Sequence, residues 1–262
     1  MVLKFAANLN FLFTEGAPSL ADKIKLAHRA GFKAVEIPFP NSDLNKVVDI
    51  KNETGIEVAL VNIALGSGEL NFGSASIPGA EETFKKHLSE TVEFAKAVNC
   101  KKIHIMAGLM NKATREDHLC TYKNNLKYAA SYLEKQNLIG VIEPINKYAL
   151  PSYFMNCYET ATSVLNEINS KHLRLMLDIF HLQHIRGNVT HSFKDFEDLI
   201  GHIQIAQVPN RNEPDVSGEL DYGYVFSLIT GINYEGWIGC EYKPATTTVD
   251  GLKWLSKYNL KL

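Results

Sequence analysis

Three carboxylates end apolar runs in the second half of the chain. Glu143 follows Gly-Val-Ile, Asp178 follows Leu-Met-Leu and Glu241 follows Ile-Gly-Cys. A carboxylate in apolar surroundings is costly to ionise without a partner, and several that converge repel one another. A divalent cation would supply the missing positive charge, and oxygen ligands suit Mg²⁺ or Mn²⁺. These residues therefore predict a divalent metal site, with Mg²⁺ preferred over Mn²⁺.

Gln204 stands in a fourth run of the same kind. The intervals from Glu143 to Asp178, on to Gln204 and on to Glu241 are 35, 26 and 37 residues. Each interval is the length of one strand-plus-helix unit, so neighbouring strands are expected to present one oxygen ligand each. The alternative for any single carboxylate is that it caps the next helix or pairs with a nearby Lys or Arg.

Four basic side chains follow or end such runs and are candidates to bind substrate. They are His104, His181, Arg211 and Lys243. His181 lies three residues after Asp178, where an imidazole could donate to a substrate oxygen. Taken alone, Arg211 is more typical of a solvated loop charge than of a substrate contact, and His104 is more typical of a satisfied buried network.

The elements that must position these residues alternate along the whole chain. Near-continuous apolar runs are typical of parallel strands covered on both faces, and three- and four-residue spacing is typical of amphipathic helices. The strands are expected at 3–9, 34–39, 57–63, 102–107, 138–143, 173–178, 202–208 and 237–242. Helices are expected at 19–30, 81–98, 115–135, 158–169 and 221–230, among others.

Eight such units in 262 residues predict an α/β fold, a (β/α)₈ TIM barrel forming one domain over residues 1–262. A doubly wound open sheet has the same alternation. However, its Gly-x-Gly-x-x-Gly fingerprint is missing after the first run, where Asn10-Phe-Leu-Phe-Thr-Glu stands instead. In a TIM barrel the catalytic groups lie at the carboxyl ends of the strands, where the acidic residues are expected.

Composition and charge restrict the partners. Lys and Arg total 27 against 29 Asp and Glu, a net charge of −2, and this balance argues against a dedicated nucleic-acid binder. No run approaches the roughly 20 apolar residues that span a bilayer, and the N-terminus lacks the apolar stretch of a signal peptide. The four cysteines show no Cys-x-x-Cys spacing and are expected to be free thiols. We therefore expect a cytoplasmic protein without membrane or nucleic-acid partners. The sequence does not reveal whether it forms a homo-oligomer.

Several segments together resemble hydroxypyruvate isomerases, which belong to the xylose-isomerase-like TIM barrels and are related to D-tagatose 3-epimerases. The resemblance runs from about residue 3 to residue 258. It rests on Phe5-Ala-Ala-Asn-Leu-Asn with Phe13-Thr-Glu, His104-Ile-Met-Ala-Gly, Glu143-Pro-Ile-Asn, Asp178-Ile-Phe-His, Arg211-Asn-Glu-Pro and Gly236-Trp-Ile-Gly-Cys-Glu-Tyr-Lys-Pro. The Glu143 block and the Gly236 block are the most specific.

The resemblance implies an enzyme, an aldose–ketose isomerase that interconverts hydroxypyruvate and 2-hydroxy-3-oxopropanoate through a metal-stabilised enediolate. Glu143 and Glu241 would be the acid and base, and Glu143, Asp178, Gln204 and Glu241 would bind the metal. His181 and Arg211, with His104 and Lys243, would contact a small hydroxy-keto acid.

One departure from the epimerase relatives bears on the substrate. Their additional substrate-contacting glutamate, six residues after the first metal ligand, falls on Ala149. This difference favours a three-carbon substrate over a longer sugar. The alternatives are a ketose 3-epimerase or related sugar isomerase, a polyol dehydratase, an endonuclease IV-like repair enzyme, and a catalytically inactive barrel that only binds.

Overall fold

Eight short parallel strands alternate with helices in the computed structural model, which describes residues 2–262. The strands follow one another in sequence order around a closed barrel, as the (β/α)₈ prediction requires. The strands are β1 Lys4–Asn8, β2 Ala34–Ile37, β3 Glu57–Asn62, β4 Lys102–His104, β5 Ile139–Ile142, β6 Leu173–Asp178, β7 Ile200–Ile205 and β8 Trp237–Cys240. The TIM-barrel prediction is confirmed, and the doubly wound alternative is wrong.

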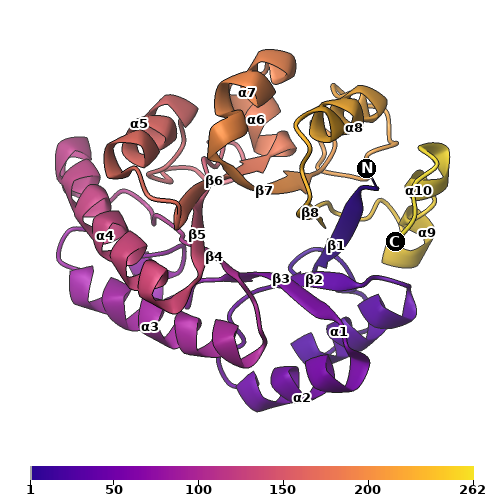
Figure 1. Cartoon of the computed structure of the whole chain (residues 1–262), viewed down its shortest axis with the longest axis horizontal. Helices are drawn as coiled ribbons and strands as arrows, with labels where there is room; N and C mark the ends of the chain where they lie inside the picture. The colour runs from indigo at the N-terminus through magenta and orange to yellow at the C-terminus, as the bar shows by residue number, and fades with distance from the viewer. Residues whose placement is uncertain (1) are drawn as a thin grey trace. The chain divides into compact units, whose positions relative to one another are not determined.

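Helices connect the strands (Figure 1). They are α1 Leu20–Arg29, α2 Leu44–Thr54, α3 Glu81–Ala97, α4 Arg115–Gln136, α5 Tyr158–Ile168, α6 Ile179–Ile185, α7 Val189–Phe196, α8 Tyr222–Gly231, α9 Thr248–Gly251 and α10 Trp254–Lys257. The ends of α1 are set by local chemistry. The side chain of Ser19 accepts a hydrogen bond from the backbone N–H of Asp22, which satisfies an otherwise unpaired donor of the first turn.

By backbone contacts the chain divides into two compact units. The first comprises residues 1–59, 177–198 and 202–262, and the second comprises residues 60–176 and 199–201. The single domain over 1–262 stays a prediction.

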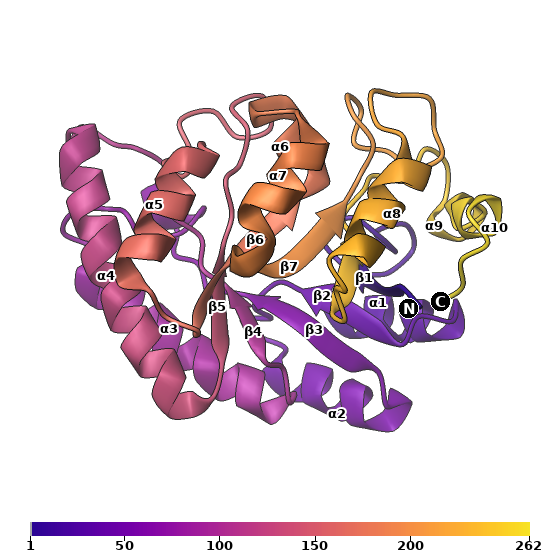
Figure 2. The ribbon, with the colours of Figure 1, turned by 45° about the horizontal axis from the view of Figure 1, so that its top comes forward.

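In the first unit, the strand register brings polar residues of different strands opposite one another. β1 pairs with β2 and with β8, and Asn8 lies opposite Glu36. β8 also pairs with β7, and Gln204 lies opposite Gly239. Outside the strands, α1 packs against α2, and α6 and α7 pack side by side after β6 (Figure 2).

In the second unit, β4 pairs with β3 and with β5, and β5 pairs with β6. Helix α4 packs between α3 and α5 (Figure 1). Leu60, Val141 and Met176 form a buried apolar cluster, so β3, β5 and β6 share one core. Burial on both faces explains why these strands are continuous apolar runs in the sequence.

The observed strands are mostly shorter than the predicted runs. The predicted strand at 102–107 ends at His104, and the predicted strand at 202–208 lies at Ile200–Ile205. Glu143 and Glu241 consequently follow their strands directly, whereas Asp178 is the last residue of β6. The five predicted helices agree with the structure to within one residue at either end.

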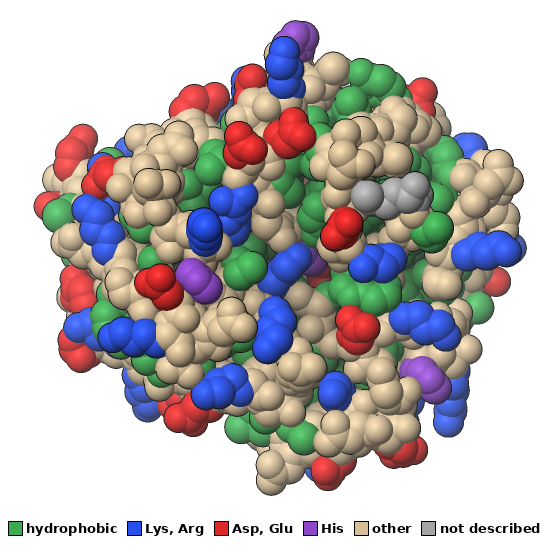
Figure 3. All heavy atoms as spheres, in the orientation of Figure 1, with side chains coloured by type: hydrophobic (Ala, Val, Ile, Leu, Met, Phe, Trp, Pro, Cys, Tyr) green, Lys and Arg blue, Asp and Glu red, His purple; other side chains and the backbone are tan. Residues whose placement is uncertain are grey.

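The surface and the helices agree with the sequence on two points. Lys and Arg side chains are interspersed with Asp and Glu over the face in Figure 3. Among the described residues, no helix combines the length and apolarity that crossing a bilayer requires.

Candidate active site

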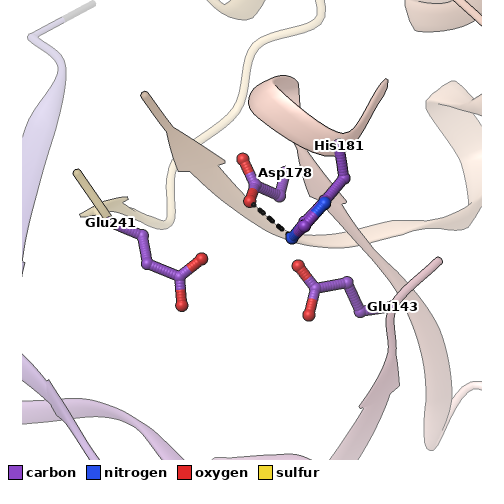
Figure 4. Close-up of side chains that lie close together, drawn as sticks. All are labelled: Glu143, Asp178, His181 and Glu241. Carbon is purple, nitrogen blue, oxygen red and sulfur yellow. Dashed lines mark ion pairs between the residues drawn. The ribbon is translucent and has the colours of Figure 1, made fainter. Parts of the chain in front are cut away.

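Asp178 and His181 form the first part of the site, at the junction of β6 and α6. The Asp178 side chain is fully buried, and its Oδ1 accepts a hydrogen bond from the backbone N–H of Phe180 at 2.9 Å, which caps α6. One turn along this helix, Nε2 of His181 lies 3.5 Å from Oδ2 of Asp178 (Figure 4). The helix cap therefore fixes a carboxylate and an imidazole side by side.

Glu241 approaches Asp178 from the end of β8. Figure 4 shows its carboxylate turned toward the space beside Asp178. Its Oε1 accepts a hydrogen bond from Nδ2 of Asn8 at 3.1 Å. Two strand-end carboxylates predicted to converge thus do so within the first unit.

Arg211 lies between these two carboxylates. Its Nη2 donates to Oδ2 of Asp178 at 3.2 Å and, more closely, to Oε2 of Glu241. The guanidinium carbon lies 4.6 Å from the ring centre of Phe11 and 4.7 Å from that of Phe180. Both rings therefore add cation–π attraction to the two ion pairs. Arg211 is a structured site residue, and its interpretation as a solvated loop charge is wrong.

The backbone also holds Arg211 in place. Its φ of 59° lies in the left-handed region, which few residues other than glycine adopt. Its N–H donates to the carbonyl of Gln207 at 2.8 Å, and its carbonyl accepts from the N–H of Lys243 at 2.6 Å. The exposed Lys243 thus supports the loop of Arg211 through its backbone.

Burial makes the acidic pair reluctant to ionise. Burial is the main cause that raises the pKa of Glu241 to about 8; Arg211 opposes it, and the neighbouring Asp178 and Glu36 add to it. Burial likewise raises the pKa of Asp178, against the opposing effect of Arg211. One guanidinium therefore does not offset the cost of burying both charges, and a further cation would be stabilised here.

Gln204 presents an oxygen without a protein partner. Its Nε2 donates to Oε2 of Glu36 at 2.8 Å. Its Oε1 is buried, and among the described residues no donor reaches it. A buried acceptor left unpaired costs about 1–3 kcal/mol, so this oxygen fits a ligand role for a cation.

Glu36 is a functional neighbour that the sequence interpretation left out of the site. It lies on β2, is almost completely buried, and accepts hydrogen bonds from Asn8, His202 and Gln204. Glu36 lies inside the second apolar run rather than after it, and its contacts depend on the pairing of neighbouring strands, which the run itself does not show.

The donor set of the first unit suits a divalent metal. One candidate ligand atom from each of Asp178, His181 and Glu241 lies within 4.8 Å of the others. Two carboxylates and an amide oxygen favour a hard cation, and the imidazole of His181 would also accept Mn²⁺. The residues therefore fit the metal that the sequence predicts.

In the second unit, Glu143 and His104 form a buried pair. Glu143 directly follows β5 and His104 ends β4. Nε2 of His104 lies 3.5 Å from Oε2 of Glu143. Both side chains are at most 5% exposed, so the imidazole and the carboxylate share a low-dielectric environment.

Comparisons with known proteins agree with the barrel fold. Residues 24–258 match the family described as xylose isomerase-like TIM barrel. A Drosophila melanogaster protein named "Putative hydroxypyruvate isomerase" is 53% identical over the full length of both chains. The Escherichia coli hydroxypyruvate isomerase is 35% identical, with 98% of this chain and 100% of that protein covered.

Two further relatives carry other names. The 2-oxo-tetronate isomerase of Cupriavidus necator is 38% identical, with 97% of this chain and 98% of that protein covered. A crystal structure titled AP endonuclease, family 2, from Brucella melitensis is 33% identical and superposes with a TM-score of 0.91, over 97% of this chain and 98% of that one.

The family match and the full-length identity to an isomerase lead to the same assignment. The chain belongs to the hydroxypyruvate isomerase family of xylose isomerase-like TIM barrels and is an isomerase by descent.

Proposed function

We propose that the protein interconverts hydroxypyruvate and 2-hydroxy-3-oxopropanoate. The observation that carries the proposal is the pair of buried carboxylates, Asp178 and Glu241, held with Arg211 in a chain 53% identical to a relative named for this reaction. Hydroxypyruvate is itself a carboxylate, and a fixed guanidinium is the side chain that matches a carboxylate with two parallel hydrogen bonds.

The reaction moves one proton between neighbouring carbons. A base removes a proton from C3 of hydroxypyruvate, which gives an enediolate, and an acid returns a proton to C2. The hydroxyl proton moves from the oxygen on C3 to the oxygen on C2, so the atoms balance. We assign the two proton transfers to Glu143 and Glu241, because a positioned carboxyl can serve as either base or acid.

We further propose that Glu143, Asp178, Gln204 and Glu241 hold a divalent cation, Mg²⁺ or Mn²⁺. Support comes from the unpaired Oε1 of Gln204 and from the candidate ligand atoms of Asp178, His181 and Glu241, which lie within 4.8 Å of one another in the first unit. When bound, the cation would stabilise negative charge on the two substrate oxygens.

The remaining predicted residues would bind the substrate. Arg211 is assigned to its carboxylate and His181 to an oxygen near the reacting carbons. His104 would act through Glu143, since its Nε2 lies 3.5 Å from that carboxylate. Lys243 has an exposed side chain and would meet only the outer part of the substrate. A cytoplasmic location and the absence of nucleic-acid partners stay predictions.

The second candidate is a longer substrate. The Cupriavidus relative is named for 2-oxo-tetronate, an acid with one more carbon, at an identity similar to that of the Escherichia coli enzyme. The same acid–base pair would serve both acids. A ketose 3-epimerase remains the alternative activity on this barrel.

The test is a coupled assay on hydroxypyruvate with and without chelation. Turnover should vanish in protein shown by elemental analysis to be metal-free, and Mg²⁺ or Mn²⁺ should restore it. The same panel should include 2-oxo-tetronate, fructose and psicose. Full activity in verified metal-free protein would overturn the metal assignment, and faster turnover of a ketose than of either acid would overturn the substrate assignment.

A further inference from the structure

Glu36 is the only buried carboxylate of the barrel strands to which the proposed mechanism gives no role, among the residues that the structure describes. It lies on β2, opposite Asn8 in the register, and is 1% exposed. Its Oε2 accepts hydrogen bonds from Nδ2 of Asn8 and Nε2 of Gln204, both at 2.8 Å. Its Oε1 accepts one from Nε2 of His202.

The contact with Gln204 determines which way that amide points. An amide group has one donor side and one acceptor side, whereas an ionised carboxylate only accepts. Because Nε2 of Gln204 donates to Glu36, Oε1 must face the other way, where it has no protein donor. Among the described residues the Gln204 side chain has no other hydrogen bond, so without an acceptor at position 36 nothing would fix the amide in this orientation rather than the flipped one.

The contact with Asn8 carries the same constraint to Glu241. Nδ2 of Asn8 donates to Oε2 of Glu36 at 2.8 Å and to Oε1 of Glu241 at 3.1 Å. Its own oxygen accepts from the backbone N–H of Asn10 at 3.0 Å, so this amide is also fixed in one orientation. The Glu36 carboxylate thus orients Gln204, a proposed metal ligand, and Asn8, which donates to the proposed ligand Glu241.

The sequence also reserves the space for this carboxylate. A Cβ atom at Gly239, on the neighbouring strand β8, would overlap Oε1 of Glu36. A glycine in a strand interior weakens the strand, and it often marks a place where another group approaches closely. Gly239 therefore allows Glu36 to reach the amides of Asn8 and Gln204.

We propose that Glu36 is a positioning residue, which presents the amide oxygen of Gln204 to the cation and holds Glu241 through Asn8. This inference rests on the proposed metal site. Removing a partner that orients a metal ligand typically lowers the metal affinity 10–100-fold. A positioning role requires acceptor oxygens at residue 36 within hydrogen-bond distance of the Asn8 and Gln204 amides. A purely electrostatic role would require only the negative charge.

Three substitutions of Glu36 distinguish the position of its acceptor oxygens from its negative charge. Glu36→Met removes every acceptor and should weaken Mn²⁺ binding by at least about tenfold. Glu36→Gln keeps an oxygen at the same reach for Asn8 and Gln204, while its amide nitrogen donates to Nε2 of His202 in the other imidazole tautomer, and it should bind Mn²⁺ within about threefold of the parent. Glu36→Asp keeps the charge but shortens the side chain by one methylene, and it should resemble Glu36→Met.

The measurement is calorimetric titration of metal-free protein with Mn²⁺ and then with Mg²⁺, alongside the melting temperature of each variant. Thr248→Val is the control for lost stability. Its buried hydroxyl accepts from the N–H of Phe13 at 2.8 Å, and it is not among the hydrogen-bond partners of Glu36, which are Asn8, His202 and Gln204. This variant should melt earlier than the parent and keep the parent's metal affinity.

The outcomes separate the two proposals. If the parent binds neither metal, both the metal site and the role of Glu36 are overturned. If the parent binds and Glu36→Met binds equally well, or Glu36→Asp binds as tightly as Glu36→Gln, only the positioning role is overturned. Should Glu36→Met not fold, the order of the Asp and Gln variants decides.

Discussion

Nη2 of Arg211 lies 3.2 Å from Oδ2 of Asp178 and donates to Glu241 as well. In the protein without a divalent ion, the guanidinium is thus the cation that compensates both carboxylates. A bound metal and Arg211 would then share the same negative charge. This relationship makes the stability of the metal-free protein depend on Arg211.

Arg211→Gln should therefore destabilise the metal-free protein and increase its response to metal. Removing one partner of a buried ion pair typically costs about 3–5 kcal/mol, since the remaining charge is uncompensated. A divalent ion would restore compensation, so the melting temperature should rise further on addition of Mn²⁺ in the variant than in the parent. Differential scanning calorimetry with and without Mn²⁺ measures both effects.

The control for this prediction is Arg186→Gln. Arg186 pairs with Asp195 at a partly exposed position and should contribute little to stability. Its response to Mn²⁺ should equal that of the parent. An equal Mn²⁺ response in Arg211→Gln would show that the guanidinium does not compensate the metal ligands.

The four cysteines should differ widely in reactivity at pH 8. Burial raises the pKa of the Cys100 thiol to about 12, and its Sγ donates to the carbonyl of Lys102 at 3.2 Å. Cys120 is exposed. Because only the thiolate is nucleophilic, Cys100 should react with iodoacetamide at least about a hundredfold more slowly than Cys120. Mass spectrometry of the labelled peptides measures both rates.

Unfolding should abolish this difference. In denaturant both thiols lose their surroundings and should react at similar rates. Equal rates in the folded protein would contradict the burial of Cys100, which precedes β4.

The sequence predicts the fold well because its signals are local. Parallel strands covered on both faces must be apolar throughout, so each run could be located to within a few residues. The strand ends are less predictable, as the run at 102–107 shows by ending at His104. The end of a strand depends on where its neighbour stops pairing, and a single run does not contain that information.

The site is predictable only in part, for a related physical reason. Asp178 and Glu241 could be found because each ends an apolar run. The capping of α6 by Asp178 and its pairing with Arg211, both considered as alternatives to metal binding, are present together with the acidic cluster. Glu36 could not be placed, because its role arises from the pairing of β1 with β2 and of β7 with β8.

Ala149 should restrict the enzyme to short substrates. It is exposed in the loop after β5, where its N–H donates to Oδ1 of Asn146 at 2.9 Å. Its methyl group offers no hydrogen bond to the hydroxyls of a longer sugar. We expect kcat/KM for hydroxypyruvate to exceed that for fructose or psicose by about 10²-fold, the scale on which an apolar side chain discriminates against an added hydroxyl.

Substitution of Ala149 tests whether this side chain causes the preference for short substrates. Ala149→Glu should lower kcat/KM for hydroxypyruvate by charge repulsion and narrow the ratio to the ketoses, whereas Ala149→Ser should change neither much. Comparable kcat/KM for a six-carbon ketose in the parent protein would indicate an epimerase.

The two glutamates can be tested as acid–base groups apart from any role as ligands. Glu143→Gln and Glu241→Gln each keep a side-chain oxygen and nearly the same volume, and they remove the basic carboxylate. In Glu241→Gln that oxygen can still accept from Asn8 or Arg211, the two donors of the present carboxylate. Both variants should retain some Mn²⁺ binding and lose about 10²-fold or more in kcat, the scale of lost general acid–base catalysis.

Initial rates and calorimetric Mn²⁺ titration of the same preparations measure the two properties separately. Glu167→Gln is the matched control, because Glu167 is a surface carboxylate paired with Lys123 and Lys127 on the helices. If each glutamate carries out one proton transfer, both site variants must show a lower kcat, because each variant lacks the acid–base group of one transfer. If one variant binds Mn²⁺ and keeps a kcat near that of Glu167→Gln, that glutamate is a ligand only, and the mechanism with two acid–base glutamates is wrong.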